Sequence, residues 1–285
     1  GRPVRAVTRR GASPAPDGVE RFAATKASAE QAAEACRGAA VVYCCLNPPY
    51  TQWPEKFPAL LEGAIAGAEA AGAKLVMGDN LYMYGPVEGP IREDCPEIAT
   101  GRKGSVRVAM SDRLIEVHQE GRVRVAIGRA SDFYGPGVVN SAMGDRVFGA
   151  ALRGETANLV GDLDMPHTYT FIDDFARGLV TLGEQSAADG QVWHTPNAPA
   201  VPTREFVSRV YRAAGREPKM RAVGRIVVTT MSWFNPMMGE IQEMLYTWER
   251  PYVVDHSKFE RTFGATFTPI DEGIARTIEW FRGRA

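Results

Sequence analysis

Two kinds of segment alternate along the first part of the chain. Short apolar runs rich in β-branched residues are followed by longer segments with helical periodicity, several of which end at a glycine. The clearest apolar run, residues 39–46, predicts a strand covered on both faces. The pattern predicts strands at 3–7, 19–23, 39–46, 74–77 and 123–127, and helices at 28–37, 53–71 and 111–119.

This alternation predicts an α/β fold, a Rossmann-like doubly wound parallel sheet with a smaller C-terminal substrate lobe. We predict the sheet domain over residues 1–200, with 138–166 contributing to the substrate lobe, and the rest of that lobe over 201–285. The looser second half predicts helices at 142–153, 173–185, 203–214, 236–248 and 271–282, with short strands at 168–172 and 192–195.

Composition narrows the function classes. The 285 residues are 45% hydrophobic and 24% charged, which is typical of a globular protein. A net charge of −1 gives no general attraction to nucleic acid or to anionic membranes, and no apolar run is long enough for a transmembrane helix. Four cysteines at 36, 44, 45 and 95 fit neither a zinc site nor a disulfide framework. We expect a cytoplasmic protein with a small-molecule substrate and no metal.

Ligands of doubly wound sheets bind at the carboxyl ends of the strands. Thr8, Arg9 and Arg10 follow the first strand, where an acidic residue would read the ribose 2′-hydroxyl of NAD. Two guanidinium groups suit a phosphate instead, so the sequence favours NADP, with NAD possible and a solvated basic turn as the alternative. The loop after the third strand, expected beside a cofactor ribose or pyrophosphate unless it is a plain proline-rich turn, contains Leu46, Asn47 and Pro48.

Polar residues gather after three later segments. Asn80, Tyr82 and Tyr84 follow the strand at 74–77, and a strand end with two phenols and an amide indicates a ligand site or a hydrogen-bonded turn. Further candidates at the later strand ends and loops are Ala130 and Ser131 for a cofactor, and Asp132, Tyr134 and His167 for a substrate.

Three segments carry a resemblance to a known family. Residues 79–85 (DNLYMYG), 129–137 (RASDFYGPG) and 171–176 (FIDDFA) resemble the NAD-dependent epimerase/dehydratase branch of the short-chain dehydrogenase/reductases, as an atypical extended member. The resemblance runs from about Arg2 to the C-terminus. It implies a nicotinamide cofactor, a substrate lobe to which Trp233 contributes, and a possible homodimer.

The catalytic signature of that family, Tyr-x-x-x-Lys with an earlier Ser or Thr, is altered here. The overlay places Lys103 at the tyrosine, Arg107 at the lysine and Asn80 at the hydroxyl residue. The resemblance then implies Lys103 as a general acid, Arg107 as a ribose ligand and Asn80 as a hydrogen-bond donor to a carbonyl oxygen. Tyr82 is the alternative phenolic acid. The competing interpretation places Lys103 and Arg107 as exposed charges at the start of a helix.

The family also begins with a strand and a Gly-x-x-Gly-x-x-Gly loop that receives the cofactor pyrophosphate, and this sequence contains no such loop. We expect about 30 residues, one strand and one helix, to be missing before Gly1. Because that strand is central in the family's sheet, its loss is expected to split the sheet and expose two strand edges.

Together these features predict an NAD(P)-dependent oxidoreductase that transfers a hydride to or from a small carbonyl or alcohol substrate. Two alternatives stay open. One is a non-catalytic NAD(P)-binding sensor or scaffold protein, which the altered signature favours. The other is an epimerase or dehydratase with a transient hydride step.

Overall fold

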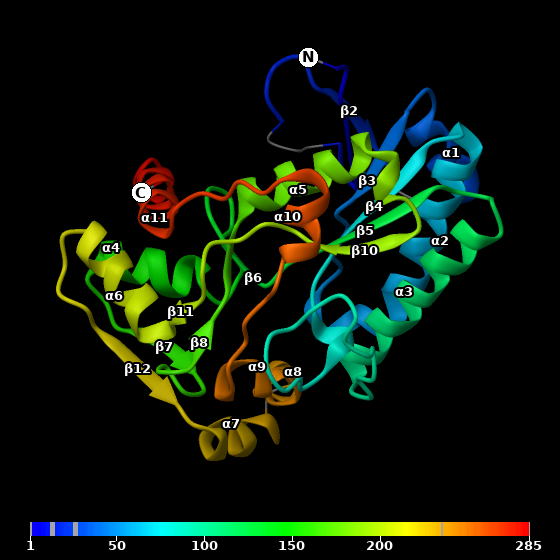
Figure 1. Cartoon of the computed structure of the whole chain (residues 1–285). Helices are drawn as coiled ribbons and strands as arrows, with labels where there is room; N and C mark the ends of the chain where they lie inside the picture. Colours follow the sequence, from blue (N-terminus) through cyan, green and yellow to red (C-terminus); the bar gives the residue numbers. More distant parts are fainter. Residues whose placement is uncertain (1, 12–14, 25–27, 235, 285) are drawn as a thin grey trace.

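The computed structural model describes residues 2–11, 15–24, 28–234 and 236–284. Its centre is a parallel four-stranded sheet with the order β10-β5-β4-β3 (Figure 1). These strands are β3 (Val41–Cys44), β4 (Lys74–Asp79), β5 (Val125–Arg129) and β10 (Gln191–His194). Every neighbouring pair is parallel, and helices connect the strands, which confirms the predicted α/β class.

Helices cover both faces of this sheet. α2 (Trp53–Ala71) and α3 (Arg102–Gln119) pack on the side chains of Leu75 and Ile127. α5 (Ile172–Glu184) packs on the opposite face, beside Val76 and Ala126. Successive side chains of a strand point to opposite faces, so burial on both sides requires the continuous apolar runs of β4 and β5.

The sheet ends at β3. β1 (Arg5–Thr8) pairs with β2 (Glu20–Ala23) in a separate parallel sheet, and α1 (Ala29–Cys36) packs on α2. Within the described residues β1 and β3 therefore each have one edge without a strand partner, as the sequence predicted for a divided sheet. The prediction that β3 is covered on both faces is wrong for part of the strand, because Tyr43 is 40% exposed at this edge.

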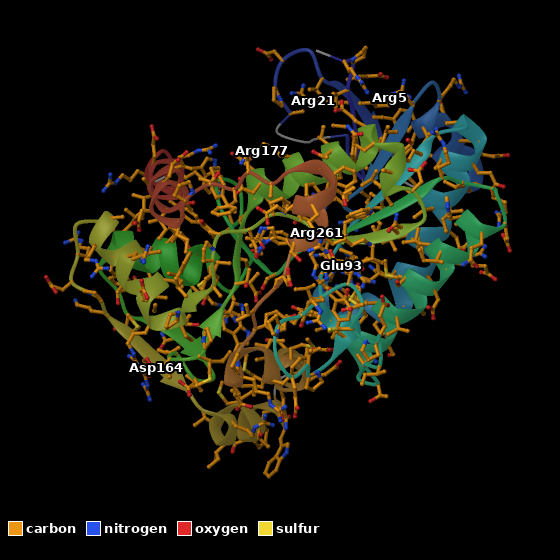
Figure 2. The ribbon with its side chains drawn as sticks, viewed as in Figure 1. Arg5, Arg21, Glu93, Asp164, Arg177 and Arg261 are labelled. Atoms are coloured by element: carbon orange, nitrogen blue, oxygen red, sulfur yellow. The ribbon has the colours of Figure 1, made fainter. Side chains whose placement is uncertain are left out.

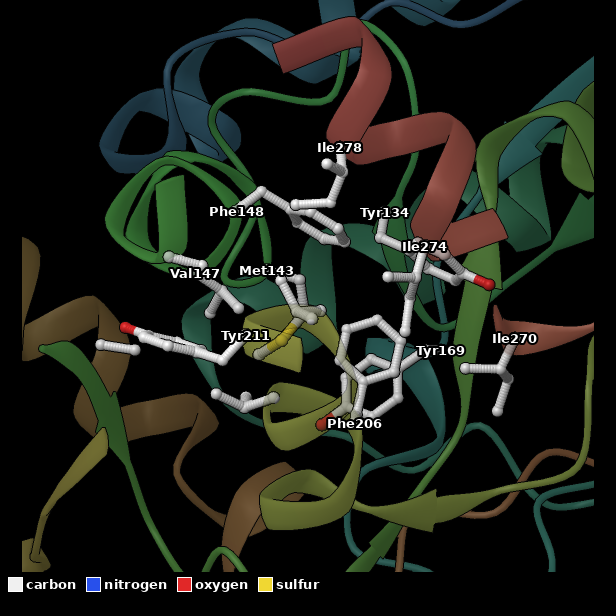
Figure 3. Close-up of a cluster of buried hydrophobic side chains, with 14 of the residues drawn as sticks. Tyr134, Met143, Val147, Phe148, Tyr169, Phe206, Tyr211, Ile270, Ile274 and Ile278 are labelled. Carbon is white, nitrogen blue, oxygen red and sulfur yellow. The ribbon is translucent and has the colours of Figure 1, made fainter. Parts of the chain in front are cut away.

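A second core lies beside the sheet and joins residues 134–171 with the C-terminal part of the chain. Tyr134, Phe148, Phe206 and Ile274 meet in it (Figure 3). The helices around it are η3 (Gly144–Gly149), α4 (Ala150–Arg153), α6 (Thr203–Ala213) and α11 (Ile270–Arg282). The paired short strands are β6 (Asp132–Tyr134) with β9 (Tyr169–Phe171), β7 (Ala157–Val160) with β12 (Met220–Val223), and β8 (Pro166–His167) with β11 (Val201–Pro202).

Several predicted helix bounds are corrected. α3 begins at Arg102 rather than at residue 111, and the helix expected over 142–153 begins with a π-helical turn. The helix expected over 236–248 is interrupted at Leu245. The remaining helices are η1 (Tyr50–Gln52), η2 (Tyr82–Tyr84), η4 (Ser186–Ala188), α7 (Arg225–Ser232), α8 (Pro236–Met244), α9 (Tyr246–Glu249) and α10 (Ser257–Phe263). Among the described residues, every helix is too short or too polar to cross a bilayer.

Candidate functional site

Two opposite charges end the central strands. Asp79 closes β4 and Arg129 closes β5, and the two residues are register partners at the carboxyl edge of the sheet. An Asp79 carboxylate oxygen lies 2.8 Å from Nη1 of Arg107 on α3, and the other lies 3.6 Å from Nε of Arg129. All three side chains are buried, so this edge of the sheet carries a compact ionic network.

Arg129 is held inside the protein by its own chain. Its guanidinium donates to the Tyr84 hydroxyl at 2.7 Å and to Ser111 Oγ at 2.9 Å, and lies 2.7 Å from a Glu97 carboxylate oxygen. Burial alone would lower the pKa of Arg129, but Tyr84, Asp79 and Glu97 raise it above its usual value. Tyr84, which we predicted to bind substrate, therefore points into this enclosed network. These contacts fix the strand ends rather than present a group to a ligand.

The same network reaches His194 at the end of β10. Nε2 of His194 lies 3.0 Å from the Tyr84 hydroxyl, and Nδ1 lies 3.0 Å from the Asp255 carbonyl oxygen. The Glu93 carboxylate, near the middle of the molecule in Figure 2, accepts from the His194 backbone N–H at 2.8 Å. Burial lowers the pKa of His194 to about 3, so its imidazole is neutral at physiological pH.

Lys103 is fully buried in the first turn of α3, and it is bound by α8 and by Tyr50 in η1. Its ammonium lies 2.7 Å from a Glu240 carboxylate oxygen on α8 and also donates to the Tyr50 carbonyl. The nitrogen sits 4.3 Å from the centre of the Tyr50 ring. The Lys103 backbone N–H donates to Glu243 at 2.6 Å. Two carboxylates of α8 thus hold α8 against the start of α3. We call these two contacts the α8 latch.

Arg107 lies one turn further along α3 and is also buried. Its guanidinium carbon sits 4.3 Å from the centre of the Trp53 ring and 4.2 Å from that of Phe57, and Asp79 binds it. Burial lowers the pKa of Arg107, and the Asp79 charge opposes this effect. The interpretation of Lys103 and Arg107 as exposed charges is therefore wrong. Both cations are bound by groups of this chain.

A pair of phenols lies beside the α8 latch. The rings of Tyr50 and Tyr82 both pack against Trp53, with ring centroids 5.0 Å and 5.9 Å from that of Trp53, and each phenol affects the pKa of the other. Asn80 holds the turn, because its Oδ1 accepts from the Tyr82 backbone N–H at 3.1 Å. Burial, followed by the nearby Tyr50 and Asp132, raises the pKa of Tyr82 well above its usual value. Tyr82 is therefore a protonated phenol at neutral pH.

An imidazole–carboxylate pair lies in the same region. Nε2 of His167 is 2.8 Å from Asp132 Oδ2, and the His167 ring stacks on Trp248 with centroids 4.2 Å apart. Tyr252 stacks on His167 at 5.2 Å. Asp132 raises the pKa values of Tyr50 and Tyr82, so its charge acts on both phenols. The structure thus brings together Tyr82, Asp132 and His167 from three separate predicted segments.

The residues predicted to bind cofactor lie at strand ends with different exposure. Arg9, Arg10, Leu46 and Asn47 are exposed, whereas Pro48, Ala130 and Ser131 are buried. Two hydroxyls at these strand ends are buried and have no hydrogen-bond partner in the protein. They belong to Thr8 at the end of β1 and to Ser131 after β5. Unpaired buried hydroxyls at strand ends fit a polar ligand such as a dinucleotide. On α3, both buried cations are bound by carboxylates of this chain, and Nε of Arg107 is a further buried donor without a hydrogen-bond partner.

Two predicted substrate residues lie apart from this region. Tyr134 packs in the second core, 5.0 Å from the ring of Phe206, and Trp233 is 76% exposed after α7. Sequence reasoning also missed Glu240 and Glu243, because nothing in the sequence of α8 indicates contact with a segment more than 130 residues earlier. Within the described residues, no cluster of three or more metal-ligating side chains occurs.

Comparison with known sequences gives this site a family context. A sequence model described as "NAD dependent epimerase/dehydratase family" matches residues 64–194, which include β4, α3, β5 and the strand-end network. Residues 64–194, somewhat less than half of the chain, are therefore similar to this family. No curated protein sequence gives a significant match to the chain. The match confirms the resemblance expected from residues 79–85, 129–137 and 171–176.

Three solved structures share the fold. MoeE5 in complex with UDP-glucose and NAD superposes with a TM-score of 0.78 at 21% identity, covering 100% of this chain and 92% of that one. UDP-N-acetylglucosamine 4-epimerase from Bacillus cereus superposes with a TM-score of 0.76 at 13% identity, covering 98% of this chain and 88% of that one. DesIV, a dTDP-glucose 4,6-dehydratase from Streptomyces venezuelae with NAD and TYD bound, superposes with a TM-score of 0.70 at 18% identity. The match covers 95% of this chain and 81% of that one. At these identities the likeness shows the Rossmann-like fold.

Proposed function

We propose that this protein is an NAD(P)-dependent oxidoreductase that reduces a small carbonyl substrate to an alcohol, with Tyr82 as the proton donor. The observation that carries the proposal is the protonated Tyr82–Tyr50 phenol pair beside the end of β4. A phenol whose pKa is raised stays protonated at neutral pH but is a weaker acid, so Tyr82 would donate to the substrate oxygen only as negative charge develops on it during hydride transfer. Lys103 is a poorer donor because Glu240 and Tyr50 already bind its ammonium.

A nicotinamide cofactor supplies the hydride, and the protein supplies the proton and the orientation. The hydroxyls of Thr8 and Ser131 would hold polar groups of the dinucleotide at two strand ends. Arg9 and Arg10, both exposed after β1, would bind a ribose 2′-phosphate, which favours NADP over NAD. The solved structures with NAD show NAD in those proteins, and NADP is our proposal for this one.

In the proton step, the Tyr82 O–H bond breaks as the substrate oxygen gains that proton. With a hydride supplied by a bound nicotinamide, this proton would complete the reduction of the carbonyl group to an alcohol. The Asp132–His167 pair lies close enough to influence both phenols, and its carboxylate favours their protonated forms.

Substitution of Tyr82 tests this assignment. We expect Tyr82→Phe to lower kcat for NADPH-dependent reduction about 100-fold, because the acid contributes at the transition state, while cofactor affinity stays unchanged. NADPH consumption is followed with a panel of small aldehydes, ketones and keto sugars. The matched control is Tyr43→Phe, at a partly exposed phenol on β3. Full kcat in Tyr82→Phe would remove Tyr82 from the chemistry.

A non-catalytic NAD(P)-binding sensor or scaffold is the second candidate. The ion pairs of Lys103 and Arg107 favour it, because the overlay puts both cations at the family's catalytic positions and carboxylates of this chain already bind them. This candidate expects cofactor binding without turnover of any substrate in the panel.

An epimerase or dehydratase with a transient hydride step is the third candidate, by analogy with the dTDP-glucose 4,6-dehydratase and the 4-epimerase. It expects cofactor that stays bound through purification. In each case we propose a cytoplasmic location.

A further inference from the structure

Aromatic rings from separate segments of the chain gather around the Asp132 carboxylate. His167, which donates to Asp132 at 2.8 Å, stacks on Trp248 with ring centroids 4.2 Å apart. β8 and α9, which carry these two rings, lie together in Figure 1. Burial raises the pKa values of Tyr50 and Tyr82 most, and the Asp132 charge raises them further, so both phenols lie within its reach. We call this group the aromatic site: Tyr50, Tyr82, Asp132, His167, Trp248 and Tyr252.

One buried hydroxyl of the aromatic site has no partner in the protein. Tyr252 is only 5% exposed, and its ring lies 5.2 Å from that of His167, yet its hydroxyl makes no hydrogen bond. Burial, followed by the nearby Tyr246 and Asp132, raises its pKa well above the usual value, so the hydroxyl faces these two groups. Buried hydroxyls in proteins are nearly always hydrogen-bonded. The unused hydroxyl therefore indicates a polar ligand next to Asp132, whose side chain is 22% exposed.

Two carboxylates at the aromatic site keep their negative charge. Glu240 is matched by the ammonium of Lys103 at 2.7 Å. Glu243 accepts the Lys103 backbone N–H at 2.6 Å, and among the described residues no lysine or arginine side chain forms an ion pair with Glu243 or with Asp132. After burial, the charges of Asp132 and Glu243 both raise the pKa of Tyr50, so they act on the same place. The site therefore favours a positively charged ligand over an anionic one.

The chain itself places an ammonium group beside these rings. The Lys103 nitrogen lies 4.3 Å from the centre of the Tyr50 ring and 5.3 Å from that of Trp53, next to the Glu240 carboxylate. Aromatic faces attract cations, and the attraction strengthens where water is excluded. The Asp132 side of the site offers the same two components, a carboxylate and aromatic rings, to an ammonium group from outside.

We propose that the aromatic site recognises a small carbonyl compound that carries an ammonium group, with the positive charge bound by Asp132 and the surrounding rings. The inference rests on the proposed carbonyl reduction and names its substrate class. The Tyr252 hydroxyl supplies a hydrogen-bonding group for the polar part of the same substrate. UDP-glucose, which MoeE5 binds, carries a diphosphate that would bring further negative charge toward Asp132 and Glu243.

Calorimetric titration of the full-length protein with two ketones of equal shape tests the proposal. Acetonyltrimethylammonium and methyl neopentyl ketone differ only in a positively charged nitrogen in place of a carbon, and UDP-glucose is the anionic comparison. With or without NADPH, we expect the ammonium ketone to bind at least about tenfold tighter than its neutral isostere, and UDP-glucose to bind more weakly than either.

Asp132→Asn removes the charge and keeps a side chain of the same shape. We expect this variant to reduce the preference for the ammonium ketone to below about threefold, with the affinity for the neutral ketone unchanged. Asp164→Asn, at a 62% exposed carboxylate, is the matched control and should keep the wild-type preference. The comparison of the two ketones on the wild-type chain needs no variant, so it decides the point even where Asp132→Asn fails to fold.

Binding is measured apart from turnover, so the inference and the proposed function can fail separately. Preferred binding of the ammonium ketone without any NADPH consumption would contradict the reduction and support the charge preference. Equal binding of the two ketones, no binding of the ammonium ketone, or tighter binding of UDP-glucose would overturn the inference, even if NADPH is consumed with neutral ketones. A full preference in folded Asp132→Asn would also overturn it, because the charge would then bind elsewhere.

Discussion

At the scale of single residues, the site is built from charges removed from water in pairs. The family overlay singled out Arg107 as a ribose ligand, but its ion pair with Asp79 could not be predicted. That contact, and the approach of Arg129 to Asp79, depend on strand register and helix packing. Removing one member of such a buried pair leaves the other charge without a partner, which lowers the free energy of unfolding by several kcal/mol. The exposed ion pair of Arg204 and Asp164 stabilises the fold far less, because water screens the attraction between its charges.

His194 makes stability depend on pH in a defined direction. Its pKa is about 3 in the folded protein and about 6.5 when unfolded, so its contribution is complete above pH 6.5 and is lost as the pH falls toward 3. Between pH 6.5 and pH 5 we expect this group to remove about 2 kcal/mol of unfolding free energy. Urea unfolding of the wild type and His194→Gln measures it. The same pH slope in both proteins would refute the assignment.

At the scale of elements, the sequence predicted those helix bounds that depend on neighbouring residues alone. α2 was expected over residues 53–71 and spans Trp53–Ala71, because its apolar face and terminal Gly72 are both local signals. The start of α3 was missed by nine residues because Lys103 and Arg107 interrupt its apolar pattern. Their burial depends on Glu240, Asp79 and aromatic rings brought from elsewhere, which no periodicity reveals.

The α8 latch gives a test at this scale. We expect the double variant Glu240→Gln/Glu243→Gln to make the backbone amides of α8 exchange at least about tenfold faster, because both carboxylate contacts to α3 are lost. Hydrogen-exchange mass spectrometry measures this, with the amides of β4 and β5 as internal reference. Glu116→Gln, at a 57% exposed carboxylate on α3, is the matched control. Unchanged exchange in α8 would show that other contacts hold it.

At the scale of the whole molecule, two cores are joined at the carboxyl edge of the parallel sheet. The expected class, the strand order along the chain and the division of the sheet between β1 and β3 agree with the structure. The pairing of β7 with β12 could not be read from the sequence, because more than 50 residues separate the two strands. The α8 latch links the lobes where the family match and the strand-end residues coincide.

Calorimetric titration of the full-length protein with NADPH and with NADH tests the central claim, that these strand ends serve a nicotinamide dinucleotide. We predict saturable binding of one NADPH per chain, at least about tenfold tighter than NADH, and a preference that disappears in Arg9→Ala/Arg10→Ala because the 2′-phosphate loses its guanidinium partners. Absence of binding by either dinucleotide at millimolar concentration would contradict the account.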